Sequence, residues 1–230
     1  MHSMIFANLW TGWLEYIIHN QTEFWSLLSS HLRMVLIGEF AAILVAVPAG
    51  IVATRHKQLG WIVMNLGAVA QTIPPLAVIA LSFTAIGLGQ RPAILALFFY
   101  ALLPILKNTA AGIRQVEDSQ LEAGRGMGMT DLQRLRRIEL PLASPVIFSG
   151  IRTSTVMSIG VAYLGAFIGA GGFGKWVILG QQRFETDILL AGAIPGAVLV
   201  ILLDQAFARL ESHMTPTNVS TDEGTGTQTA

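Results

Sequence analysis

The chain has 230 residues, of which 53% are hydrophobic and only 12% are charged, and its 14 basic side chains balance its 14 acidic ones. The mean hydropathy is +0.59. Soluble domains carry roughly 25% charged residues and disordered chains are polar, so this composition excludes both classes. A neutral chain also lacks the basic surface typical of nucleic-acid binding. The absence of cysteine excludes disulfides, thiolate metal ligands and a cysteine nucleophile. The composition therefore favours a bundle of membrane-spanning helices.

Residues 1–32 form the first distinct segment, in which aromatic side chains alternate with polar ones. Trp10, Trp13 and Trp25 lie among acidic and amide side chains, a mixture typical of the membrane–water interface. No lysine or arginine precedes Arg33, so the segment lacks the positive start of a cleavable signal. We expect a helix that lies along the outer membrane surface.

Five apolar stretches follow within residues 33–214, and each is long enough to cross a membrane as a helix. A spanning helix needs roughly 20 mostly apolar residues, whereas spanning β-strands are shorter and alternate in polarity. The sequence therefore predicts an all-α, polytopic membrane helix bundle. The five predicted spans are Met34 to Thr54, Leu59 to Leu88, Pro92 to Ile113, Leu142 to Ala170, and Ile188 to Leu210.

The second predicted span contains a break. As one helix it would extend roughly 45 Å, well beyond a hydrocarbon core of roughly 30 Å. Gln71 and Thr72 precede Pro74 and Pro75 in its middle, and a proline removes a helical hydrogen bond and disfavours a helical residue before it. Irregular backbone at that depth must face protein or a water-filled cavity. Two interpretations stay open: a packed kink, or a break that lines a transport pathway.

Lysine and arginine are distributed unevenly between the two ends of the predicted spans. Most of them lie after the first span and between the third and fourth spans, and the positive-inside rule places these loops in the cytoplasm. We therefore expect the N-terminus outside and the C-terminus inside a bacterial cell membrane. Residues 215–230 are largely Thr, Gly and Ser, which predicts a disordered cytoplasmic tail.

The longest polar stretch between spans is predicted to form a compact projection. Residues 118–126 fit a short amphipathic helix that is ended by Gly126 and Gly128, and residues 130–137 fit a second helical piece. Such a small projection has little apolar surface to bury within itself. We therefore expect it to dock on a partner protein.

Fixed spacings within this stretch resemble the EAA motif of ABC importer permeases. The matching residues are Glu122, Ala123 and Gly124, then Gly128 after three residues, then Ile138, Leu140 and Pro141 after nine more. The family pattern is Glu-Ala-Ala, three residues, Gly, nine residues, Ile-x-Leu-Pro, so only Gly124 departs from it. The resemblance implies a coupling helix that docks on a separate ATPase subunit. The alternative is a plain surface loop in which Glu122 caps a helix.

Further segments are similar to the osmoprotectant-uptake permeases, which handle glycine betaine, carnitine and choline. Residues 46–51, 71–81, 96–113 and 169–174 carry this similarity. It implies a type I ABC importer permease fold that forms the translocation pathway for such solutes. It also implies an ABC ATPase subunit, a separate substrate-binding protein, a second permease copy or similar chain, and membrane lipid as partners. No cofactor, metal or nucleic acid is expected, and ATP hydrolysis is expected on the ATPase chain, so this chain is not an enzyme.

Three charged residues inside the predicted spans are open to two interpretations. Glu39 and Asp204 either belong to a substrate or ion path or are paired structural groups. Arg152 is a candidate partner of either Asp204 or an interfacial lipid. Residues 169–174 match a dinucleotide-binding pattern, but they follow a membrane helix rather than a strand, so we expect a tight external turn.

Tyr163 is a further candidate pathway residue, together with the four polar and proline residues of the break. Tyr163 and Phe167 lie four residues apart, so they either pack between helices or offer an aromatic face to a quaternary ammonium group.

Three other classes of membrane protein fit the sequence less well than the importer. An ABC permease for another small solute, such as an amino acid, is opposed only by the subfamily similarity. An ion-coupled secondary transporter would need paired carboxylates or an inverted repeat, and no convincing repeat is present. An intramembrane enzyme would need a nucleophile or metal set, and neither a nucleophile elbow nor histidines at ligand spacing occur.

Overall fold

Helices account for every regular element in residues 2–214, the part of the chain that the computed structural model describes, with side chains over residues 11–211. The elements are α1 (His2–His19), α2 (Gln21–Arg55), α3 (Lys57–Thr72), α4 (Pro75–Ile86), α5 (Gln90–Arg114), α6 (Asp118–Gly126), α7 (Asp131–Arg134), the π-helix η1 (Leu135–Glu139), α8 (Leu140–Ala162), the 3₁₀-helix η2 (Tyr163–Ile168), α9 (Gly174–Arg183) and α10 (Thr186–Met214).

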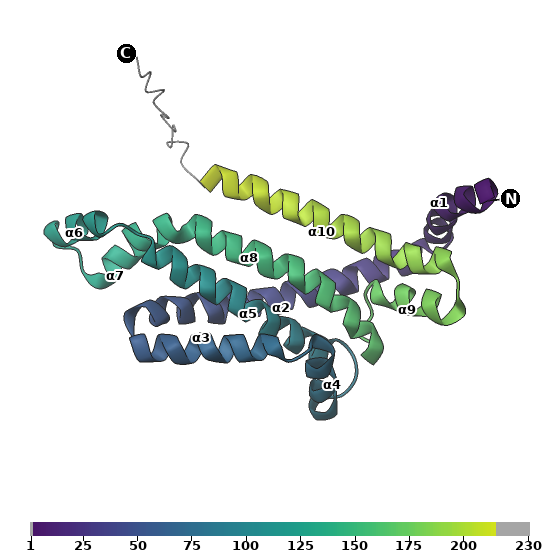
Figure 1. Cartoon of the computed structure of the whole chain (residues 1–230), viewed down its shortest axis with the longest axis horizontal. Helices are drawn as coiled ribbons and strands as arrows, with labels where there is room; N and C mark the ends of the chain where they lie inside the picture. The colour runs from purple at the N-terminus through teal and green to yellow at the C-terminus, as the bar shows by residue number, and fades with distance from the viewer. Residues whose placement is uncertain (1, 215–230) are drawn as a thin grey trace, which may run out of the picture.

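Four helical segments in the described part are long and apolar enough to cross a membrane, and the bent pair α3–α4 makes a fifth if it counts as one span. The predicted all-α membrane bundle is therefore confirmed. The fourth predicted span corresponds to α8 and η2, and helical structure continues into it from Asp131 of the polar segment. Helices α2, α5, α8 and α10 run along the long axis of the molecule (Figure 1).

The helix predicted within residues 1–32 is present as α1, which is separated from α2 at Asn20. Trp13 and Tyr16 of α1 pack against a cluster that includes Trp176 of α9, and α1 also contacts α10. The boundary at residue 33 stays a prediction, since α2 runs through it without interruption. The tail expected over residues 215–230 lies outside the described residues.

The central helix α5 lies between α2 and α8 at close approach. A Cβ atom on Gly38 of α2 would lie 2.8 Å from Leu97 Cβ, and one on Gly150 of α8 would lie 2.6 Å from Asn108 Cβ. Lipid tails are as apolar as the side chains, so association of membrane helices depends on such close packing. Small residues at these points therefore let three helices pack as one unit.

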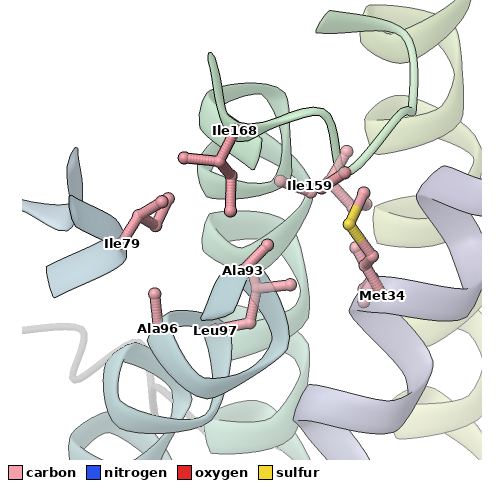
Figure 2. Packing of buried hydrophobic residues seen from close by; sticks show 10 residues of the cluster. Met34, Ile79, Ala93, Ala96, Leu97, Ile159 and Ile168 are labelled. Atoms are coloured by element: carbon pink, nitrogen blue, oxygen red, sulfur yellow. The ribbon is translucent and has the colours of Figure 1, made fainter. Parts of the chain in front are cut away.

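A buried apolar cluster attaches the short helix α4 to this unit (Figure 2). It joins Met34 of α2, Ile79 of α4, Leu97 of α5, Ile159 of α8 and Ile168 of η2, all of which are buried. Five helical segments thus meet at one point, and this contact fixes where α4 leaves the bundle.

The predicted break in the second span is confirmed. The axes of α3 and α4 meet at 94°, and Ile73 and Pro74 between them have extended backbone. Pro75 is the first residue of α4, where its missing N–H is not needed. The Tyr100 hydroxyl donates to the Ile73 carbonyl, and Gln71 Nε2 donates to the Tyr100 carbonyl at 3.0 Å. Two hydrogen bonds to α5 therefore hold the bend.

Replacing Tyr100 by phenylalanine should weaken the bend, because the Ile73 carbonyl would lose its partner in an apolar environment. We expect a loss of about 1 kcal/mol, seen as a fall of roughly 2–4 °C in the melting temperature of the purified protein in detergent. Thr84→Val is the matched control, since the Thr84 hydroxyl bonds only to the carbonyl of Leu81 in its own helix. Equal melting temperatures for Tyr100→Phe and wild type would contradict the role of Tyr100.

Candidate functional site

The polar segment between α5 and α8 projects from one end of the bundle, and α1 and α9 lie at the other end (Figure 1). The helix predicted over residues 118–126 is confirmed as α6. The second helical piece begins as α7 and continues through η1 directly into α8. A displacement of α7 is therefore passed to a membrane-spanning helix without an intervening loop.

Gly124 and Ile138, both motif residues, lie in contact. Gly124 is buried, and a Cβ atom there would meet Ile138 Cδ1 at 2.7 Å and the Arg134 side chain at 3.3 Å. The nearest of these atoms is the end of a flexible side chain, so an alanine, the usual family residue, needs only a small shift of Ile138. The departure from the family pattern at Gly124 is thus compatible with the same packing.

The opposite face of the projection is open. Glu122 and Ala123 are exposed, as are two apolar side chains, Met127 at 68% and Leu132 at 55%. These side chains are accessible for contact with another protein. Met127 and Leu132 were not singled out from the sequence, where a lone apolar residue in a polar loop carries little signal.

Gly128 and Thr130 shape the turn between α6 and α7. Gly128 has a φ of 73°, which a residue with a side chain adopts only with strain. The Thr130 hydroxyl accepts from the N–H of Gln133 at 3.3 Å, and the Gln133 side chain accepts from the N–H of Thr130 at 2.8 Å. This capping box fixes the start of α7. The residues between Glu122 and Ile138 therefore include the turn that separates α6 from α7.

Pro141 explains the π-helical turn that precedes it. It lacks an N–H, and its ring crowds the carbonyl four residues earlier, so it disturbs the α-helical hydrogen bonds at this position. The chain widens into η1 over Leu135–Glu139 instead, and the N–H of Leu140 bonds to the Leu135 carbonyl. Leu140 and Pro141 thus lie at the start of α8, where the projection meets the membrane helix.

Glu139, the variable residue of the motif, is buried and forms an ion pair with Arg55 at the end of α2. The Glu139 side chain is 2% exposed and that of Arg55 is 40% exposed. The ion pair ties the coupling segment to a second spanning helix. The motif pattern did not reveal this pair, because a variable position gives no signal and Arg55 is distant in sequence.

The candidate pathway residues of the break lie apart from the projection, since α4 leaves the bundle well away from α6 and α7 (Figure 1). Thr72 and Pro74 are exposed in the single chain, whereas Gln71 and Pro75 are partly buried. Tyr100 was missed from the sequence, although a tyrosine in an apolar span usually needs a hydroxyl partner.

Tyr163, the fifth candidate, begins η2. Its hydroxyl donates to the Gly192 carbonyl of α10 at 2.9 Å, and its ring meets the His31 ring edge-on. These contacts are with α2 and α10, whereas Gln71 and Tyr100 hold the break. A pathway role for Tyr163 stays a prediction.

Two polar groups inside the spans are paired. The Glu39 carboxylate accepts hydrogen bonds from Ser154 and Ser158 of α8, the latter at 3.2 Å. The candidate pair of Arg152 and Asp204 is present, with two hydrogen bonds of 2.6 and 2.8 Å between α8 and α10. The contacts agree with the interpretation of Glu39 and Asp204 as paired structural groups.

Removal of Arg55 should cost more stability than neutralisation of Glu139. Arg55→Met leaves a buried carboxylate without a partner, for a loss of about 2 kcal/mol, whereas Glu139→Gln leaves Arg55 able to reach water and should cost under about 1 kcal/mol. The check is thermal unfolding of the purified variants in detergent. Arg33→Met, an exposed position on the same helix, is the control. The reverse order of the two effects would contradict this assignment.

The sequence was compared with families and with individual proteins. Residues 46–216 match the family described as binding-protein-dependent transport system inner membrane component. The choline transport system permease protein OpuBB of Bacillus subtilis is 44% identical over 186 residues, which cover 81% of this chain and 86% of that protein. The osmoprotectant import permease protein OsmW of Salmonella typhimurium is 40% identical over 211 residues, 90% of this chain and 98% of that protein.

The carnitine transport permease protein OpuCD of Listeria monocytogenes is 45% identical over 195 residues, 84% of this chain and 86% of that protein. Among solved structures, an inward-facing form of the MetNI methionine ABC transporter has a TM-score of 0.72 at 20% identity, covering 85% of this chain and 97% of that chain. This likeness confirms the expected type I ABC importer permease fold. The chain therefore belongs to the family of binding-protein-dependent transport system inner membrane components, the multi-pass permease subunits of ABC importers.

Proposed function

We propose that this permease forms the translocation pathway for osmoprotectants that carry a quaternary ammonium group, such as glycine betaine, carnitine or choline. The observation that carries the proposal is 40–45% identity, over 81–90% of the chain, to permeases named for choline, carnitine and osmoprotectant import. A similarity of this extent includes the spanning helices as well as the coupling segment.

The segment from Glu122 to Pro141 is the proposed docking site of a separate ABC ATPase subunit. Its support is the exposed face that carries Glu122, Ala123 and Met127, together with the unbroken connection from α7 into α8. The buried contact of Gly124 with Ile138 lets α6 act as a rigid lever. Movement of the ATPase is thereby passed to α8, and through the Arg55–Glu139 ion pair to α2.

We assign the opposite end of the bundle, with α1 and α9, to the outer side of the membrane, where a substrate-binding protein delivers the solute. The positive charge near α6 and α7 supports this orientation, with the C-terminus in the cytoplasm. A second copy of the chain, or a similar permease, completes the pathway. Thr72 and Pro74 at the break are exposed in the single chain, so they are available to line a path between two permeases.

The transported solute is tested by uptake of radiolabelled glycine betaine at high osmolarity. Cells with and without this chain are compared, with the partner subunits present in both, and unlabelled choline, carnitine and methionine are added as competitors. We expect uptake to require the chain and to be competed by the two quaternary amines. Competition by methionine alone would replace the osmoprotectant proposal with an amino-acid importer.

The coupling assignment is tested with Glu122→Lys, which reverses the charge on the proposed docking face. We expect the variant to insert in the membrane at a normal level but to lose at least tenfold in uptake and in co-purification with the ATPase subunit. Glu117→Lys is the matched control, because Glu117 is exposed on the same projection but precedes α6. Normal uptake by Glu122→Lys would remove Glu122 from the docking site.

A further inference from the structure

α10 contains a weakened turn near its outer end. Pro195 lies inside the helix and has no N–H, so the Ala191 carbonyl loses its helical partner. Gly192 and Gly196 flank the proline, and glycine costs about 1 kcal/mol relative to alanine within a helix. Sharp bends of helices occur at such proline and glycine positions. The turn over residues 191–196 is therefore the point at which α10 bends most easily.

The Tyr163 side chain occupies this turn. Its hydroxyl donates to the Gly192 carbonyl at 2.9 Å. Gly196 leaves the room for it, since a Cβ atom at that position would collide with the Tyr163 hydroxyl. A ring that only filled space between helices would not need a hydroxyl, whereas this hydroxyl bonds to the backbone of the weakened turn.

Tyr163 itself is held on three sides. It begins η2, where the chain leaves α-helical geometry at the end of α8. Its ring lies 5.1 Å from the His31 ring of α2. Its carbonyl oxygen lies against Gly174, the first residue of α9, where no side chain would fit. The hydroxyl is thus presented to α10 from a fixed position.

The same cluster connects Tyr163 with the glycine-rich turn at residues 169–173. His31 Nδ1 accepts from the N–H of Phe173 at 3.4 Å, and its Nε2 donates to the Ile159 carbonyl at 3.1 Å. The Ser30 hydroxyl donates to the Ala170 carbonyl at 3.1 Å. Displacement of the turn would therefore move His31 and, with it, the ring of Tyr163.

The continuous segment of α8 and η2 is joined to α10 on both sides of Pro195. Tyr163 bonds to Gly192 on the outer side, and Arg152 bonds to Asp204 on the inner side. α8 is also the helix that continues from the coupling segment. A change in the bend at Pro195 would therefore alter the relation of α10 to the helix on which the ATPase acts.

We propose that Tyr163 is a positioning residue for transport, whose hydroxyl holds the turn of α10 at Pro195 in one conformation and releases it as the pathway changes state. The inference rests on the proposed transport function, because the hinge has a task only in a permease that alternates between states. Tyr163 would then connect the glycine-rich turn at residues 169–173 with α10.

The bend is measured across the hinge with two spin labels. The chain has no cysteine, so Phe184→Cys and Leu202→Cys introduce label sites, at positions that are 94% and 59% exposed. In the assembled transporter without nucleotide, we expect the distribution of distances to be at least twice as broad with Tyr163→Phe as with the wild-type tyrosine. Tyr16→Phe makes the same chemical change in α1 and should leave the distribution unchanged.

Gly196→Ala provides a second variant, because it keeps Tyr163 but removes the room for its hydroxyl. It should broaden the distribution in the same way. An unchanged distribution in both variants would overturn the proposal. The measurement needs no transported solute, so it can succeed even if the uptake experiment rejects quaternary amines.

A double-mutant cycle separates positioning from simple packing. Tyr163→Phe and Pro195→Ala are each expected to lower uptake at least threefold with little change in the KM for the solute-loaded binding protein. If Tyr163 acts through the hinge, the double variant should fall no further than the worse single variant. Multiplied losses would show that the two residues act independently and would refute the proposal.

Discussion

Backbone groups within a membrane must find partners inside the protein, and this constraint explains the irregular points of the bundle. Three of these points lie beside a proline, which lacks an N–H. At the break of the second span, the Tyr100 hydroxyl takes the Ile73 carbonyl. Before Pro141, the chain widens into a π-turn. Beside Pro195, the Tyr163 hydroxyl bonds to the Gly192 carbonyl.

These points also lie where the proposed function needs them. The first bends α3 against α4 at the candidate pathway, and the second joins the coupling segment to α8. The third provides the proposed hinge of α10 at Pro195, near the glycine-rich turn at residues 169–173. Between them the helices are continuous and closely packed, so movement within the bundle is expected to concentrate at the irregular points. A transporter that alternates between two states needs this combination of rigid helices and defined hinges.

Charged groups within the bundle also have partners inside the protein. Glu139 is buried and paired with Arg55, and Arg152 is paired with Asp204. Glu39 accepts hydrogen bonds from two serines rather than from a cation. Each pair connects helices that are distant in sequence, so the polar contacts determine which helices move together. The Arg55–Glu139 ion pair adds α2 to the lever formed by the coupling segment and α8.

Much of the architecture could be predicted from the sequence. The five spans follow from long apolar runs, the broken span from adjacent Pro74 and Pro75, and the segment that resembles the coupling motif from fixed spacings around Gly128. These signals are local, because hydropathy, proline chemistry and turn geometry act over a few residues. The unbroken connection into the fourth span was not predicted because Pro141 resembles a helix start, whereas the π-turn lets helical structure continue through it from Asp131.

The sequence by itself determined that the chain is a bundle of membrane helices with one polar projection and one interrupted span. Only the tertiary structure decided that Tyr100 closes the interruption, that Arg55 pairs with Glu139 and that Tyr163 reaches the turn at Pro195. A single tyrosine or arginine in an apolar run has many potential partners along the chain. The partner is selected by the packing of whole helices, which depends on contacts summed over many distant residues.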